Sequence, residues 1–105
     1  MEPTPRVSVV ITWRYGTASL ADMLRVQLPQ HQSPAELDMI VVTAEPPTDE
    51  ITEMFPDLRF ITAAPQTSVA LMRSIGVEQA HGSIVMLIDG TLDASTIERA
   101  RELVQ

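Results

Sequence analysis

The chain has 105 residues, of which 45% are apolar and 20% are charged, a balance typical of one small globular domain and not of a disordered polypeptide. A net charge of −7 argues against nucleic acid or an anionic membrane surface as a partner, and no apolar run reaches the length of a membrane span. The absence of cysteine excludes disulfides and thiolate catalysis. Since no signal peptide is recognisable, the predicted compartment is the cytoplasm.

The first half of the chain alternates between short apolar runs and helical patterns. The β-branched run at 7–12 is typical of a strand buried on both faces, and a second such run follows at 38–43. Between them, apolar side chains recur at helical spacing: Leu20, Met23, Leu24 and Leu28. After the second run, Asp49 and Glu50 are expected in the first turn of a short helix that Pro56 ends.

The second half repeats this alternation. A weaker strand is predicted over 58–62, a helix over about 66–80 and the most apolar strand over 83–88. A last helix is expected to turn four apolar side chains inward: Ile97, Ala100, Leu103 and Val104. Strands that alternate with helices predict an α/β fold, here one domain over 1–105. The expected architecture is a three-layer αβα sandwich around a four-stranded parallel sheet.

Asp89 is the most informative single residue of the sequence. Parallel sheets place ligands at the carboxyl ends of their strands, and Asp89 follows the apolar strand at 83–88, which we expect to be central. A carboxylate in that position needs a metal, a ligand, a helix cap or a turn. The alternative to a ligand site is that Asp89-Gly90 is simply a turn, in which the carboxylate bonds the backbone two residues on.

The loop after the first strand, Trp13-Arg14-Tyr15, is the second candidate. Its aromatic and basic side chains are suited to stack on a base and to pair with a phosphate. The alternative is an exposed loop whose Trp13 folds over the sheet edge. His31 and His81 have no partner at ligand spacing and are expected at the surface. The sequence has no glycine-rich phosphate-binding loop.

Three segments of the chain follow the pattern of one enzyme family. The run V-S-V-V-I at 7–11 matches the family's opening strand, and I-V-V at 40–42 matches part of its second strand. The family pattern R-N-x-G-x-x-x-A-x-G, followed by an apolar strand and an acidic run, aligns without gaps on six positions: Arg73, Ser74, Gly76, Ala80, Gly82 and Asp89. In these features the chain resembles the family 2 glycosyltransferases, inverting enzymes with the GT-A fold.

The resemblance implies a fold, a ligand and a set of binding residues. The implied fold is the Rossmann-like, donor-binding half of a GT-A domain, with strand order 3-2-1-4. The implied ligand is a nucleotide or a nucleotide-diphosphate sugar, bound together with Mn²⁺ or Mg²⁺ at Asp89 and Asp93. The implied nucleotide-sugar-binding residues are Thr12, Trp13, Arg14, Tyr15, Thr43, Glu45, Arg73 and Asp89.

The chain departs from the family pattern at functional positions. The family's base-binding acid falls on Thr43 or Ala44, and of its acidic run only Asp89 is present. Asp93 either substitutes for the missing metal ligand or caps the last helix. No catalytic residue is assigned, because the acceptor-binding half that supplies the family's general base has no counterpart in this sequence.

Three functions are compatible with this pattern. The first is a glycosyltransferase-like domain that binds a nucleotide or nucleotide sugar and is not a competent transferase alone. The second is a non-catalytic relic with a protein–protein role, such as a homodimer. The third is an active inverting transferase that uses Asp89 and Asp93 together with a partner subunit.

Overall fold

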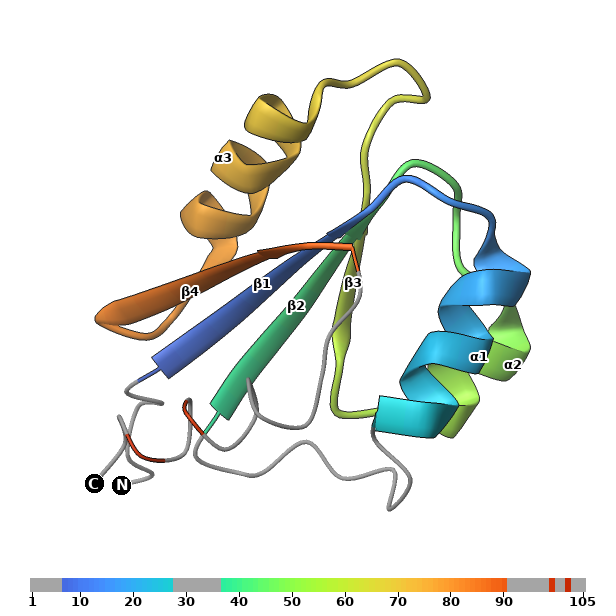
Figure 1. Cartoon of the computed structure of the whole chain (residues 1–105), viewed down its shortest axis with the longest axis horizontal. Coiled ribbons are helices and arrows are strands. Elements are labelled where there is room, and N and C mark those ends of the chain that lie inside the picture. The colour runs from blue at the N-terminus through green and yellow to red at the C-terminus, as the bar shows by residue number, and fades with distance from the viewer. Residues whose placement is uncertain (1–6, 28–36, 91–98, 100–101, 103–105) are drawn as a thin grey trace.

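A parallel sheet of four strands runs through the centre of the molecule (Figure 1). In the computed structural model, which describes residues 7–27, 37–90, 99 and 102, the strands follow the order β3-β2-β1-β4. Their bounds are β1 (Val7–Trp13), β2 (Leu37–Thr43), β3 (Arg59–Thr62) and β4 (Ile84–Asp89). All neighbours are parallel, so the predicted sheet and its 3-2-1-4 order are confirmed.

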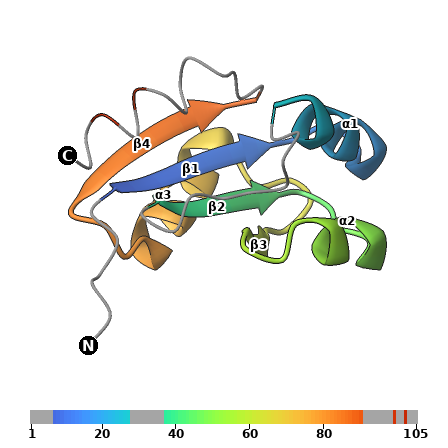
Figure 2. The same cartoon turned by 90° about the horizontal axis from the view of Figure 1, so that it is seen from below.

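Helices cover both faces of this sheet. α1 (Thr17–Gln27) and α2 (Asp49–Met54) lie on one face, and α3 (Val69–Gln79) lies on the other (Figures 1 and 2). Each layer has its own apolar core, with Leu24 of α1 in the larger one and Met72 of α3 in the smaller one. The predicted αβα sandwich is therefore confirmed. In the part of the chain that the structure describes, no helix is long and apolar enough to cross a bilayer.

β1 contributes to both cores because its side chains alternate between the two faces. Val9 and Ile11 are fully buried in the core beneath α1 and α2, whereas Val10 is buried beneath α3. The other two positions of the α3 face are Ser8 and Thr12, one toward each end of the strand. Both polar side chains are buried, so each needs a hydrogen-bond partner.

A hydroxyl side chain caps each of two helices. Thr48 accepts a hydrogen bond from the Ile51 N–H at 3.3 Å, which starts α2 and places two acids in its first turn as predicted. Ser68 accepts one from the Leu71 N–H at 3.2 Å. Because Ser68 caps α3, that helix begins three residues later than the apolar pattern indicated. The predicted last helix and Asp93 lie outside the described residues.

β4 differs from the expectation of a central, buried strand. Among the described residues it pairs with β1 alone, at the edge of the sheet. Its side chains are partly exposed, and half of the Leu87 surface is accessible. The physical reason is that α3 packs mainly over β1 and β2. The apolar composition correctly predicted that this segment forms a strand, but it did not predict the strand's position at the edge of the sheet.

A buried polar network closes the amino-terminal end of the sheet. The Asp38 carboxylate of β2 accepts hydrogen bonds from the Ser8 hydroxyl at 2.7 Å, the Arg59 Nε at 3.1 Å and the His81 backbone N–H at 2.9 Å. The Ser8 hydroxyl in turn accepts the Gly82 N–H at 2.8 Å. Burial raises the pKa of Asp38, but the hydrogen bonds and the Arg59 charge outweigh it, so the net pKa is lowered. The network ties β1, β2, β3 and the end of α3 together.

Candidate functional site

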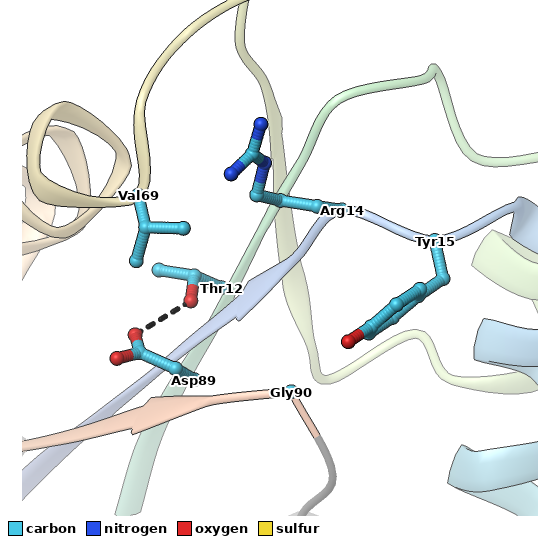
Figure 3. A pocket seen from close by; sticks show the side chains of 6 residues that line it. All are labelled: Thr12, Arg14, Tyr15, Val69, Asp89 and Gly90. Carbon is cyan, nitrogen blue, oxygen red and sulfur yellow. Dashed lines mark hydrogen bonds between the residues drawn. The ribbon is translucent and has the colours of Figure 1, made fainter.

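A hollow of about 340 Å³ opens at the carboxyl ends of β1 and β4 (Figure 3). Its volume lies within the range of small-molecule sites. Its position is the one where open parallel sheets bind ligands. The lining side chains come from β1, the loop after it, the start of α3 and the end of β4: Thr12, Arg14, Tyr15, Val69, Asp89 and Gly90.

The register of β1 and β4 brings the two strand ends together. Thr12 is the partner of Asp89, and its hydroxyl donates a hydrogen bond to the Asp89 carboxylate at 2.7 Å. The Gly90 N–H donates to the Thr12 carbonyl at 2.8 Å, which extends the ladder by one bond. Gly90 then takes a φ of +86°, a conformation that favours glycine.

Arg73 of α3 forms an ion pair with Asp89 through two of its nitrogens. Its Nε donates to the carboxylate at 3.0 Å and its Nη2 donates to the second oxygen. These bonds, with the bond from Thr12, lower the pKa of Asp89, and the bond to Asp89 raises the pKa of Arg73. Asp89 is therefore ionised and paired at neutral pH. The backbone position required by the turn alternative, Thr91, lies outside the described residues.

The three residues of the loop after β1 have separate environments. Trp13 is buried, its indole N–H donates to the Gly16 carbonyl at 3.2 Å, and it does not line the hollow. Tyr15 is two-thirds exposed and packs edge-to-face on Trp13, with ring centroids 5.1 Å apart. Arg14 is exposed and makes no ion pair with any described residue. Figure 3 shows Arg14 and Tyr15 on different sides of the hollow.

The predicted binding residues thus divide into groups. Four of them line the hollow: Thr12, Arg14, Tyr15 and Asp89. Arg73 bonds Asp89, which lines the hollow, but Arg73 itself lines a neighbouring hollow. Thr43, the last residue of β2, and Glu45 in the loop after it do not line the hollow; the Thr43 hydroxyl donates to the Glu45 carbonyl at 2.6 Å. Sequence reasoning missed Val69, the first residue of α3.

The described residues do not fit a divalent cation at this position. Mg²⁺ and Mn²⁺ require several oxygen ligands, usually from more than one carboxylate. Both oxygens of Asp89 already accept hydrogen bonds from Arg73. Among the described residues no three acidic, histidine or cysteine side chains gather as a metal site would require. Asp93, the second predicted ligand, lies outside them.

Comparison with solved structures identifies the fold. Residues 1–349 of S. aureus TarS, a GT-A-type glycosyltransferase, superpose on 92% of this chain with a TM-score of 0.65 and 20% sequence identity. The chain has a GT-A-type fold. The same TarS segment in complex with UDP superposes with a TM-score of 0.62 and 21% identity over 92% of the chain. No family model and no curated protein matches the sequence.

The match covers part of the GT-A enzyme. This chain spans 31% of the TarS segment, so the likeness concerns the sheet and helices described above. The predicted Rossmann-like GT-A fold is confirmed by it. Membership of family 2 and the roles of single residues in the hollow stay predictions.

Proposed function

We propose that this GT-A-type domain binds a nucleoside diphosphate or its sugar ester in the hollow, with UDP as the first candidate. One observation carries the proposal: an exposed aromatic ring and an arginine that makes no ion pair with any described residue flank the strand-end hollow. The UDP complex of TarS, a protein of similar fold, supports the choice of nucleotide. We also propose that the chain belongs to the family 2 glycosyltransferases and that it is located in the cytoplasm.

The flanking side chains suit the two ends of such a ligand. A guanidinium group presents a planar set of donors that matches phosphate oxygens, which is the role proposed for Arg14. The exposed ring of Tyr15 offers a stacking surface for a base, and its contact with Trp13 restricts how the ring can move. Thr12 and Asp89 form the floor between them.

We further propose that the domain is not a transferase by itself. An inverting transfer needs a general base to deprotonate the acceptor hydroxyl. Asp89 is the one carboxylate that lines the hollow within the described residues, and its lowered pKa and its pairing with Arg73 make it a poor base. The third predicted function is an active inverting transferase that uses Asp89 and Asp93 together with a partner subunit. In that case the partner would supply the base, and the nucleotide would still have to bind in this hollow first.

Isothermal titration with UDP tests the proposal. We expect a Kd on the order of 0.1 mM, which corresponds to about −5.5 kcal/mol. Tyr15→Ala should weaken binding by about tenfold through the loss of stacking, and Arg14→Gln by a similar factor. Arg25→Gln is the matched control, because Arg25 is an exposed arginine that lines a different hollow. No heat with UDP, GDP or dTDP, or unchanged binding in Tyr15→Ala, would contradict the proposal.

A second candidate function is self-association. Val77 of α3 and Leu87 of β4 are both exposed, and both line a neighbouring hollow of about 490 Å³. Among the described residues β4 has no partner strand on its outer edge. An exposed strand edge next to apolar side chains favours pairing with another chain, here proposed to be a second copy.

A further inference from the structure

The charges around the hollow are the opposite of those expected for a metal site. Of the residues that the structure describes, two guanidinium groups, those of Arg14 and Arg73, and one carboxylate, that of Asp89, lie in or beside it. Their formal charges sum to one positive charge. A site for a divalent cation is normally negative before the ion binds, because carboxylates hold the ion. A net positive hollow repels a dication and attracts a diphosphate.

Arg73 is held in place by its own acidic partner. Asp89 is anchored by the Thr12 hydroxyl at 2.7 Å, and it receives two of the Arg73 nitrogens. The third nitrogen, Nη1, donates to no described residue and stays available. About two-fifths of each of the paired side chains is exposed, so a ligand in the hollow can reach the pair.

We propose that the site binds its diphosphate without a divalent cation, with Arg73 and Arg14 supplying the positive charge that a metal would otherwise provide. This inference rests on the proposed function and adds that binding of the diphosphate requires no divalent cation. Asp89 is then a positioning residue that orients Arg73. It is not a metal ligand. The planar guanidinium can bond phosphate oxygens with two parallel donors, which a metal-free site requires.

Titration of UDP in excess EDTA, and separately with Mg²⁺ or Mn²⁺, measures the cation requirement. We expect the Kd in EDTA to equal that with either ion to within about twofold. A Kd that is measurable with Mn²⁺ and lost in EDTA would overturn the inference and leave the proposed function intact. No UDP binding under any of these conditions would overturn both.

Two substitutions separate a positioning role from a metal-binding role. Asp89→Asn keeps the size of the side chain and a group that bonds Thr12, and it removes the charge that competes with phosphate for Arg73. We expect UDP still to bind this variant in EDTA, with a Kd within about threefold of that of the natural chain, because the weaker positioning of Arg73 and the loss of the competing charge oppose each other. If Asp89 is instead a metal ligand, the variant loses the Mn²⁺-dependent binding, and this result would overturn the inference.

Arg73→Gln should have the reverse effect. Without the guanidinium, the Asp89 charge faces the diphosphate, and we expect the Kd in EDTA to rise by about tenfold or more. Arg25→Gln removes the same charge from a side chain of equal exposure, 42% in both cases, and should change the Kd by less than about twofold. Equal effects of the two substitutions would contradict a specific role for Arg73. Thermal unfolding of each variant verifies that it is folded.

Discussion

Two aspartates at opposite ends of the sheet each pair with an arginine, but their surroundings differ. Asp38 is buried and receives donors from two side chains and one backbone N–H. Asp89 pairs with Arg73 and is about 40% exposed at the edge of a hollow. A buried carboxylate with all its bonds satisfied stabilises a fold, whereas an accessible one is free to respond to a ligand. Burial therefore separates the structural acid from the candidate functional one.

Asp38 predicts how the stability of the protein depends on pH. Its pKa is lowered in the folded state, so its contribution to the free energy of unfolding is fully present above the unfolded value of about 3.9. That contribution is lost as the pH falls through the lower folded pKa. We expect Asp38→Asn to reduce stability at neutral pH by about 1–3 kcal/mol, since Arg59 loses its charged partner. We also expect the variant to lose less additional stability in acid than the natural chain.

Urea denaturation at a series of pH values measures both effects. Asp22→Asn is the control, because Asp22 is exposed and pairs with Arg25 at the surface, and we expect a change within about 0.5 kcal/mol. Stability curves of Asp38→Asn and the natural chain that coincide across the acid range would show that the network contributes nothing to acid sensitivity.

At the scale of the element, Gly76 sets how closely α3 packs on β1. A Cβ at this position would overlap the Cγ1 of Val10, which is fully buried in the same core. The close packing also fixes where Arg73, one turn earlier in α3, reaches the end of β4. The glycine of the family-like pattern therefore has a packing role that determines the geometry of the hollow.

Gly76→Ala should therefore destabilise the protein. Overpacking a core costs about 1–3 kcal/mol, and the better helix propensity of alanine offsets about 1 kcal/mol of it. We expect a net loss of up to about 2 kcal/mol in chemical denaturation. Combining Gly76→Ala with Val10→Ala should cost less than the sum of the two single changes, because the overlap is removed. Gly16→Ala is the control, since a Cβ there meets nothing. Additive effects of the pair would contradict the overlap.

The apolar pattern predicted the bounds of most helices and strands closely, because burial of one or both faces of an element decides which of its positions are apolar. The first strand was expected over 7–12 and spans Val7–Trp13. The start of α3 was misplaced because a single hydroxyl, Ser68, decides it. The edge position of β4 could not be read from its composition, because it depends on which strands pair; only the order 3-2-1-4 implied by the family resemblance placed this strand at the edge.

The site was only partly predictable for a related reason. The strand ends and their polar residues, including Asp89, could be located from the sequence. The bond between Thr12 and Asp89 depends on the register of two strands 77 positions apart, which no local pattern specifies. The metal prediction at Asp89 and Asp93 came from the family resemblance, which did not anticipate that Arg73 pairs with Asp89.

At the scale of the whole molecule, the second candidate function predicts a concentration-dependent mass. Light scattering after size-exclusion chromatography should show the natural chain moving from monomer toward dimer as its concentration rises. Leu87→Glu should remain a monomer, because it places a charge on the exposed edge strand. Val26→Glu is the control, since Val26 is 70% exposed on α1, across the sheet from α3. A natural chain that is monomeric at every concentration would remove this candidate.

The separation of Thr12 from Asp89 along the chain also bears on when the hollow comes into existence. β1 is made early, yet both of its neighbours in the sheet, β2 and β4, are translated after it. On the ribosome, Arg14 and Tyr15 therefore emerge without the opposite wall. In a nascent chain the hollow is incomplete until Gly90 has left the exit tunnel and bonded the Thr12 carbonyl. A ligand that needs both walls of the hollow therefore cannot assist the folding steps that precede β4.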